Sequence, residues 1–247
     1  MRRVFLISDL QIPFHDPRAT DAVAQCITDL KAKDDMVVTV GDEQDFQTIG
    51  RWALGTPLEW ERSIGKDRDT TVQVLRDLMV DHMVRSNHTD RLFASVMRRL
   101  PGLMGLPELE LENFWRLPEL GITFHKEGYR VPGTDWIVLH GDESGLSQEA
   151  GKTAMNLAKK VGLSVAYGHT HRLGLQAYTT GVNGKYVKTL FGFEVGNLMD
   201  MRKALYMKTH NWLQGFGILY VDGKHVTPMP VPIQNKSFIV EGQQWTW

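Results

Sequence analysis

The sequence is almost devoid of cysteine, because Cys26 is the only one among its 247 residues. An intramolecular disulfide framework is therefore excluded. Neither sign of charge is in excess, because 28 Lys and Arg against 29 Asp and Glu leave a net charge of -1. Any binding of a polyanion must therefore depend on a local group of basic residues. No apolar run approaches the roughly 20 residues that a bilayer span requires. The run Val4 to Ile7 is too short for a signal-peptide core, so we expect a cytoplasmic protein with no membrane partner.

Apolar residues are plentiful, at 42% of the chain, so it can bury a substantial core. The length fits one large domain better than two, and we expect a single domain over residues 1–247. Short β-like apolar runs alternate with stretches long enough for helices, which is typical of an α/β fold. The runs are Val4 to Ile7, Met36 to Val40, His82 to Val84, Trp136 to Leu139 and Leu163 to Tyr167.

Three intervening segments have helical patterns: Asp16 to Lys33, Thr70 to Met79 and Ser147 to Lys160. The first has Asp16 as N-cap and Pro17 at its first helical position. A helical insertion is expected from Arg91 to Leu120, as a lid or side wall. Beyond residue 172, two pairs of β-like runs around Gly-containing turns predict hairpins of a second sheet. These are Leu175 to Thr180 with Tyr186 to Phe193, and Phe216 to Val221 with Val226 to Pro230. Two packed sheets flanked by helices, a β-sandwich, is the predicted architecture.

Metal-competent side chains stand at or just past the ends of the apolar runs. Ligand chemistry in such sheets gathers at the carboxyl ends of strands, so we expect these side chains to meet. They are Asp9, Asp42, Asn87, His88, His140, His169 and His171. A single His or Asp at a strand end is common, but this ordered set predicts a site for two divalent cations. Imidazole, amide and carboxylate ligands suit Mn²⁺ first, with Fe, Zn, Mg and Ni as alternatives, and the absence of thiolate ligands argues against structural zinc.

Individual roles follow from the side-chain chemistry. Asp42 is the natural bridge between two cations, because its carboxylate has two oxygens and Gly41 permits a sharp turn before it. The bland alternative for Asp42 is a turn aspartate. His88 directly follows a ligand and suits a general acid, with Asp45 placed to orient it, whereas an isolated His88 would be read as a surface-turn histidine.

The order and spacing of these residues resemble the calcineurin-like metallophosphoesterase superfamily, whose pattern runs DxH, GDxxD, GNH[DE], HG and GHTH. The resemblance covers residues 4–172. Within the superfamily, the pattern is most similar to the DNA-repair exonuclease branch, and we expect a stand-alone member of the kind that phages or bacteria encode. It implies a two-sheet sandwich flanked by helices. It also implies one metal at Asp9, Asp42 and His171, the other at Asp42, Asn87, His140 and His169, and His88 as acid supported by Asp45.

This sequence departs from the superfamily pattern at three places. Gln11 stands where the pattern has histidine, which predicts a weaker first metal position, and His15 is a less favoured substitute for it. Ser86 and Thr89 replace the Gly and the acidic residue around Asn87 and His88, altering the turn without removing a ligand. Phe46 occupies the place of a phosphate-binding arginine in the protein phosphatases of the superfamily, which argues against that activity.

The sequence leaves three hypotheses about function open. The leading one is a nuclease that hydrolyses phosphodiester bonds of DNA, with Arg85 and Arg91 as substrate contacts beside Arg98 and Arg99. A solvated helix face explains these arginines equally well. Bases would stack on aromatic residues of the two insertions, namely Trp52, Trp60, Phe114 and Trp115, although aromatic residues at such spacing are more often part of the packing. The second is a phosphodiesterase or phosphatase of small or cyclic nucleotides. The third is a binding protein whose turnover Gln11 has abolished; the oligomeric state is not predicted.

Overall fold

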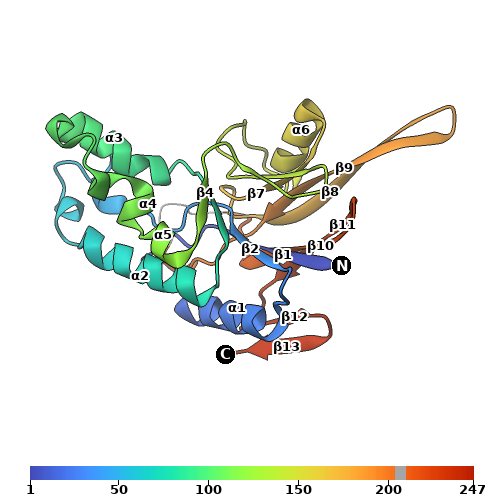
Figure 1. Ribbon diagram of the computed structural model, residues 1–247, viewed down its shortest axis with the longest axis horizontal. Coiled ribbons are helices and arrows are strands. Elements are labelled where there is room, and N and C mark those ends of the chain that lie inside the picture. Colours follow the sequence, from blue (N-terminus) through green and yellow to red (C-terminus); the bar gives the residue numbers. More distant parts are fainter. Residues whose placement is uncertain (204–209) are drawn as a thin grey trace.

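The computed structural model describes residues 1–203 and 210–247, arranged as two main sheets with helices on their outer faces (Figure 1). The first sheet has six strands in the order β11-β10-β1-β2-β3-β4. Strands β1 to β4 run parallel to one another and β10 is antiparallel to β1. Their bounds are β1 Arg2–Ile7, β2 Met36–Thr39, β3 His82–Val84, β4 Thr123–His125, β10 Gly215–Asp222 and β11 His225–Pro232.

The second sheet has five strands in the order β5-β6-β7-β9-β8. Its inner strands β6, β7 and β9 are parallel, whereas β5 and β8 are antiparallel to their neighbours. The bounds are β5 Tyr129–Arg130, β6 Trp136–Leu139, β7 Ser164–Tyr167, β8 Leu173–Val182 and β9 Lys185–Val195. The far end of the β8–β9 hairpin projects from the body of the molecule (Figure 1).

The alternation of side chains along each strand produces the layers. In β1, Val4 and Leu6 belong to the apolar cluster between the two sheets, together with Val138 and Phe193 of the second sheet. The next residue in β1, Phe5, points the other way into the cluster beneath the helices of the first sheet. A third cluster lies between the second sheet and α6 (Lys152–Val161). The predicted fold class, a two-sheet α/β sandwich flanked by helices, is confirmed.

Helices α1 (Pro17–Leu30) and α2 (Ile64–Asp77) cover the outer face of the first sheet (Figure 1). The predicted N-cap of α1 is present, since the Asp16 carboxylate accepts hydrogen bonds from the backbone of Arg18 and Ala19. Helix α2 begins earlier than Thr70, because the Ser63 hydroxyl caps it. Helix α6 begins later than Ser147, after Gly151 in the left-handed conformation, and has no capping box.

The segment expected as a helical insertion connects two neighbouring strands of the first sheet. Helix α3 (Thr89–Arg99) follows β3, and the chain returns to β4, a strand that the sequence pattern did not reveal. Short helical turns lie between them: η3 Pro101–Leu103, η4 Pro107–Leu109, α4 Leu111–Phe114 and α5 Leu117–Leu120. Two similar turns, η1 Gln47–Ile49 and η2 Pro57–Glu59, precede α2.

The two predicted hairpins form, but they belong to different sheets. The β8–β9 hairpin lies in the second sheet as expected, whereas the β10–β11 hairpin joins the first sheet beside β1, so the expectation that both build the second sheet is wrong. The physical reason is that β1 needs a second neighbour, and β10 supplies backbone groups along five of its residues. Alternation alone does not tell which sheet edge a hairpin will extend.

The last residues form a small two-stranded sheet, β12 (Ser237–Val240) and β13 (Gln243–Thr246), next to α1. Its Phe238 and Trp245 rings pack into the helix-side core, and the Trp245 indole nitrogen donates to Asp29 of α1 at 3.1 Å. In residues 1–203 and 210–247, none of the helices has the length and apolar character that a bilayer span requires.

Candidate metal centre

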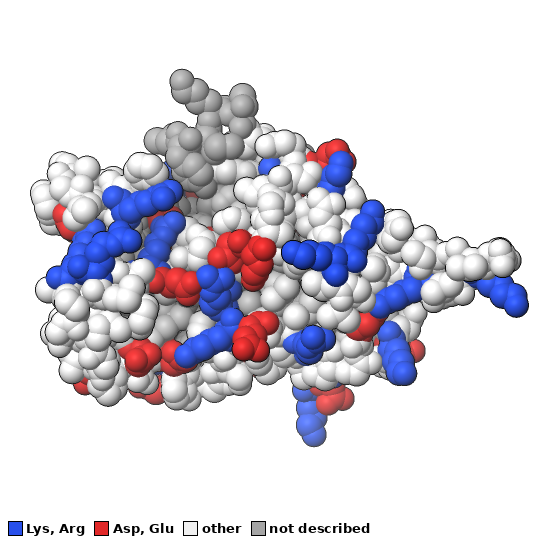
Figure 2. Space-filling view, turned by 90° about the horizontal axis from the view of Figure 1, so that it is seen from above, with Lys and Arg blue, Asp and Glu red and all other residues white. Residues whose placement is uncertain are grey.

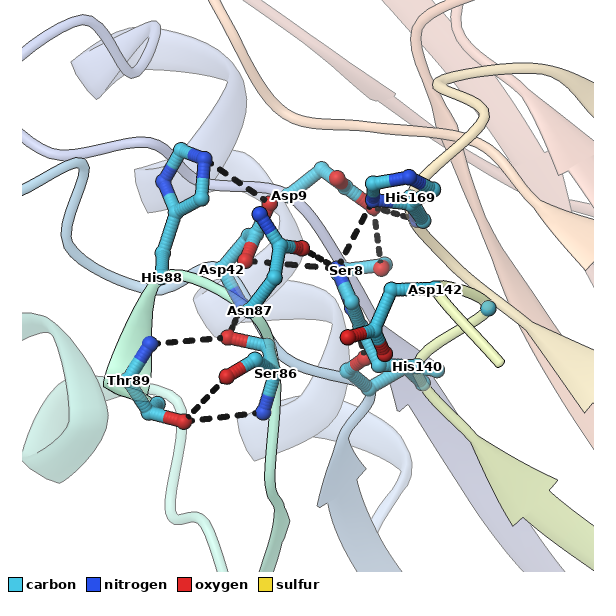
Figure 3. A network of polar contacts seen from close by, with 12 residues as sticks. Ser8, Asp9, Asp42, Ser86, Asn87, His88, Thr89, His140, Asp142 and His169 are labelled. Atoms are coloured by element: carbon cyan, nitrogen blue, oxygen red, sulfur yellow. Dashed lines mark hydrogen bonds and ion pairs between the residues drawn. The ribbon is translucent and has the colours of Figure 1, made fainter. Parts of the chain in front are cut away.

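Seven predicted ligand and catalytic side chains lie where strands of both sheets end, and Figure 3 shows Asp9, Asp42, Asn87, His88, His140 and His169 among them. The first sheet brings four of them on the loops after β1, β2 and β3, and the second brings three on the loops after β6 and β7. The seven are Asp9, Asp42, Asn87, His88, His140, His169 and His171. The cluster therefore lies across the junction of the two sheets, and its geometry depends on how they pack.

One group of ligand atoms surrounds His140. Its Nε2 atom lies 3.0 Å from Asn87 Oδ1, 3.2 Å from His169 Nδ1 and 3.3 Å from Asp42 Oδ1. Donors about 2.0–2.2 Å from a tetrahedral metal are separated by roughly 3.3 Å, so these spacings match one coordination shell. The other His140 nitrogen, Nδ1, lies 2.8 Å from the Val40 carbonyl oxygen, which fixes the tautomer that presents Nε2.

A second group lies on the other side of Asp42. Asp9 Oδ1 is 3.1 Å from His171 Nδ1, while Asp9 Oδ2 accepts hydrogen bonds from the His169 backbone nitrogen and the Ser8 hydroxyl. The Gln11 amide nitrogen donates to Asp42 Oδ2 at 2.8 Å.

Three buried side-chain oxygens of these residues favour the binding of cations at this site. Asp9 Oδ1 and Gln11 Oε1 are buried and accept no hydrogen bond in the described parts of the chain, and buried Asp42 Oδ1 has the His140 Nε2 atom at 3.3 Å as its neighbour. A buried acceptor without a donor is costly unless a cation completes it, so the residues present fit divalent metals.

The backbone holds the site in strained conformations. Asp9, Gln11, Asp42, His169 and His171 all have positive φ angles between 52° and 61°. Each such non-glycine residue costs about 1–3 kcal/mol and persists only where the surroundings enforce it. Gly168 is needed for a different reason, because a Cβ atom there would lie 2.1 Å from Ser8 Oγ and 2.8 Å from Asp9 Oδ2.

The charges of Asp42 and His140 are strongly coupled. Burial alone would raise the pKa of Asp42, but His140 and His88 outweigh burial and hold it well below 3.8. Burial likewise opposes a charged His140, yet the Asp42 carboxylate raises its pKa to about 10. A proton therefore sits where a cation would bind, and metal binding must release it.

His88 stands at the edge of the cluster, with one ring nitrogen toward Asp42 and the other toward Asp45. Its Nε2 atom lies 3.6 Å from Asp42 Oδ2, and its Nδ1 atom lies 3.8 Å from Asp45 Oδ2. The Arg91 guanidinium contacts His88 Nε2 and donates to the Asp45 backbone oxygen at 2.6 Å. Burial lowers the pKa of His88 to about 4 and raises that of Asp45 to about 6, so His88 is neutral at pH 7.

Two of the departures from the superfamily pattern have structural explanations. Ser86 and Thr89 bond to each other reciprocally: the Ser86 nitrogen donates to Thr89 Oγ1 at 2.9 Å and the Thr89 nitrogen to Ser86 Oγ at 3.2 Å. Ser86 Oγ also accepts from the Asp42 nitrogen at 3.1 Å, so this pair supports the ligand turn. Phe46 turns into the core, where it stacks on Trp115 with ring centroids 5.6 Å apart.

Sequence reasoning left several supporting residues unassigned. Glu194 is fully buried and accepts hydrogen bonds from the Thr153 nitrogen at 3.0 Å and the Thr170 hydroxyl at 2.9 Å. Asn197 donates to the His171 carbonyl oxygen at 2.9 Å. Both residues follow or end a predicted strand, but only the tertiary contacts show that they hold the loop 168–171.

A cleft of about 1,080 Å³ opens over the cluster. Asp42, His88 and His169 lie at its floor, and its walls carry five arginines: Arg51, Arg91, Arg98, Arg99 and Arg172. In Figure 2 basic residues gather at one end of the molecule, beside a hollow. Of the two predicted substrate contacts, Arg91 lines the cleft and contacts His88, whereas Arg85 lies outside the cleft lining and pairs with Asp90 and Asp142.

The aromatic residues proposed to stack bases divide into two kinds. Trp115 is fully buried and donates to Gln44 Oε1 at 2.8 Å, so the hypothesis that its ring stacks on a base is wrong. Burial of so large a ring stabilises the core. Phe114 is half-buried and packs beside Phe46. Trp52 and Trp60 are 78% and 69% exposed, and Trp52 lines the cleft.

Sequence comparison finds two phage relatives along nearly the whole chain. The gene 54 protein of Mycobacterium phage D29 is 37% identical over 256 residues, covering 99% of this chain and 98% of the relative. The chain belongs to the family of the mycobacteriophage gene 54 proteins. Another member, from Mycobacterium phage L5, is 36% identical over 257 residues, with coverage of 99% and 98%. A search of family models gave no match.

Among solved structures, this gene 54 family member is similar to Vps29 of Chaetomium thermophilum, with a TM-score of 0.48 and 13% identity over 100% of this chain and 99% of the other. Vps29 of Entamoeba histolytica complexed with Zn²⁺ gives 0.45 and 15%, covering 98% and 95%. A predicted phosphoesterase of Streptococcus pneumoniae TIGR4 gives 0.40 and 12%, covering 99% and 97%.

Proposed function

We propose that the protein is a metal-dependent phosphoesterase that hydrolyses phosphodiester bonds, and that its substrate is DNA. The observation that carries the proposal is the convergence of carboxylate, amide and imidazole donors at 3.0–3.3 Å around His140 Nε2, next to buried oxygens that accept no hydrogen bond in the described residues. Such donor sets suit divalent transition metals, with Mn²⁺ as our first choice.

The ligands would divide into two sets that share Asp42. Asn87, His140 and His169 belong to one set, and Asp9, His171 and Gln11 belong to the other. Two cations held there would supply a nucleophile near neutral pH and neutralise the charge of a phosphate. The convergence of both sets at one floor of the cleft supports a dinuclear site.

His88 and its neighbours would deliver a proton to the leaving oxygen. His88 lies beside the ligands, with the Arg91 guanidinium at its Nε2 atom and the Asp45 carboxylate 3.8 Å from its Nδ1 atom. The pKa of His88 is lowered to about 4 by burial, so donation of a proton requires the negative charge of a bound phosphate, which raises the pKa. Substrate binding thereby prepares the acid for the leaving oxygen.

A comparison of substrates tests this proposal. Metal-stripped protein is resupplied with Mn²⁺ and given bis-p-nitrophenyl phosphate, p-nitrophenyl phosphate, and labelled single- and double-stranded DNA. We expect cleavage of the diester and of DNA. A preference for the monoester would move the assignment to a nucleotide phosphatase, and no turnover with Mn²⁺, Fe²⁺, Zn²⁺, Mg²⁺ or Ni²⁺ would favour a binding protein.

A further inference from the structure

We infer that the arginine-lined cleft is a binding track for a single-stranded polynucleotide, with phosphates on the inner face of α3 and one base stacked on Trp52. This inference rests on the proposed function, because it names the substrate that the metal centre would cut. The overall charge is -1, so the five arginines in one cleft are a local concentration of positive charge, and such a concentration favours binding of a polyanion. Acidic lining residues are Asp42 and Asp45, which belong to the metal centre.

One wall of the track is the face of α3 that looks into the cleft. Arg91, Ala94, Ser95 and Arg98 line it at the helical spacings i, i+3, i+4 and i+7. The two arginines are thus about 10 Å apart along the helix axis. The small side chains between them let a ligand approach the backbone of the helix. This arrangement provides one cation beside the metal centre and another farther along a chain of phosphates.

Arg98 is free to bind phosphate. It is exposed, and within residues 1–203 and 210–247 it makes no hydrogen bond or ion pair. Its neighbour Arg99 is instead held by Glu59 at 2.7 Å, and Arg91 by the backbone oxygen of Asp45. A solvated, unpaired guanidinium keeps all five donors for a phosphate and releases counterions when it binds one.

The loop 47–53 contributes an aromatic surface to the same cleft. Trp52 is 78% exposed, which is unusual for so large an apolar ring. Arg51 lies over its ring, with the guanidinium carbon 4.7 Å from the centroid, so one face is covered by a cation. A nucleobase has a flat π-face that can stack on such a ring.

The stacking surface favours single strands over duplexes. In a duplex the base faces are already stacked on one another, so Trp52 gains no contact without unpairing. The cleft has a volume of about 1,080 Å³, and its arginines extend along α3 away from the metal centre, so it offers room beyond a single nucleotide. DNA and RNA single strands share this chemistry, and the experiment compares them.

Fluorescence anisotropy of labelled 20-nucleotide DNA and RNA strands, a DNA duplex and a mononucleotide tests the inference, using the full chain in EDTA so that nothing is cleaved. We expect Arg98→Glu to weaken single-strand binding about tenfold or more and to lower the salt dependence by about one phosphate contact. Trp52→Ala should weaken it by about fivefold to a hundredfold.

Each variant has a matched control. Arg76→Glu makes the same charge change at an exposed arginine in the last turn of α2, and Trp60→Ala removes a tryptophan that is 69% exposed; neither residue lines the cleft. Both controls should bind single strands like the wild type. Circular dichroism and urea unfolding check that all four variants fold.

Three results would overturn the inference: single-strand binding by Arg98→Glu no weaker than by Arg76→Glu, a duplex bound as tightly as the single strand, or a mononucleotide bound as tightly as the 20-nucleotide strands. Equal affinity for DNA and RNA would support recognition through the phosphates and base faces that both share. A preference for either would identify which nucleic acid the cleft binds. Hydrolysis of bis-p-nitrophenyl phosphate by the wild type is measured separately. Turnover of bis-p-nitrophenyl phosphate without polynucleotide binding would contradict the inference and the choice of DNA as substrate but leave the phosphoesterase centre standing. Polynucleotide binding without turnover would contradict the phosphoesterase centre and leave the binding track standing.

Discussion

Gln11 would make the two ligand sets of the proposed metal centre unequal. Its amide nitrogen donates to Asp42 Oδ2 at 2.8 Å, while its own oxygen is buried and accepts no hydrogen bond in the described residues. A neutral amide oxygen binds a borderline metal less tightly than an imidazole does. The cation next to Asp9 and His171 should therefore be the weaker of the two.

We predict that Gln11→His tightens the weaker metal position about tenfold or more, because an imidazole replaces the amide. Titration calorimetry of metal-free protein with Mn²⁺ measures both affinities. Gln47→His places the same side chain on the cleft wall outside the ligand cluster and serves as control. An unchanged affinity in Gln11→His would show that residue 11 does not contact the metal.

Glu43 is a buried acid directly beside a ligand. It is 1% exposed, and both carboxylate oxygens are without a hydrogen bond in the described residues. Burial raises its pKa from 4.5 to about 7. The folded state therefore holds this proton more tightly than the unfolded state, and stability falls as the pH rises from about 4.5 to about 7.

We predict that Glu43→Gln stabilises the metal-free protein at pH 8 by up to roughly 3 kcal/mol, the size of the pKa shift expressed as free energy. At pH 4.5 the variant and the wild type should differ little. Urea unfolding in EDTA at both pH values gives the difference, and Glu127→Gln, at an exposed position, provides the control. An equal effect of Glu43→Gln at both pH values would contradict the prediction.

Single residues at strand ends were predictable because parallel strands deliver their carboxyl ends to one edge. Asp9, Asp42, His140 and His169 illustrate this, since each follows an apolar run in the sequence. The orientation of Phe46 and Trp115 was not predictable. Both are aromatic residues in irregular segments, and only the covering helices decide whether such rings are buried or exposed.

At the scale of elements, Glu194 connects the start of α6 to the loop after β7. Its two oxygens accept one hydrogen bond from Thr153 and one from Thr170, which lies between the ligands His169 and His171. We predict that Glu194→Gln lowers the free energy of unfolding by about 1–3 kcal/mol, because the amide nitrogen cannot accept a hydrogen bond.

The same change should weaken Mn²⁺ binding, since the loop that carries two ligands loses a support. Urea unfolding and calorimetry measure the two effects. Glu149→Gln, at an exposed carboxylate that pairs with Lys152 near the start of the same helix, should change neither by much. Equal behaviour of the two variants would show that Glu194 does not position the loop.

Most helices and strands were predictable from the periodicity of apolar residues, whereas the pairing of the strands was not. Strands β2, β3, β6 and β7 match their apolar runs to within one residue, because each is a short, mostly buried segment, and β1 begins two residues before its run. Strand β4 was missed, since Thr123–His125 is a partly exposed edge strand of three residues without an apolar pattern. The placement of β10 beside β1 depends on long-range pairing that no local pattern encodes.

At the scale of the whole molecule, the candidate site joins the two sheets. Asp9, Asp42 and Asn87 follow strands of the first sheet, and His140, His169 and His171 follow strands of the second. A cation bound there contacts both, so unfolding must release it. Binding to the folded state alone adds about 2.7 kcal/mol of stability at a metal concentration 100 times the dissociation constant.

We predict that Mn²⁺ raises the urea midpoint of the wild type and of His88→Ala, relative to EDTA. Asp42→Asn should show little or none of this increase, because it loses the charged ligand shared by both sets. The change in midpoint on adding metal is compared within each variant, so the variant's own stability does not enter. A full increase in Asp42→Asn would place the metal elsewhere.

The most direct measurement is hydrolysis of bis-p-nitrophenyl phosphate by the wild type and by His88→Ala, both stripped of metal and resupplied with Mn²⁺. We predict that metal restores turnover in the wild type and that His88→Ala loses about 100- to 10,000-fold of it, as expected for a general acid, while keeping its metal-induced stabilisation. Absence of turnover in the wild type, or normal turnover in His88→Ala, would contradict the assignment of a phosphoesterase centre in which His88 serves the leaving group.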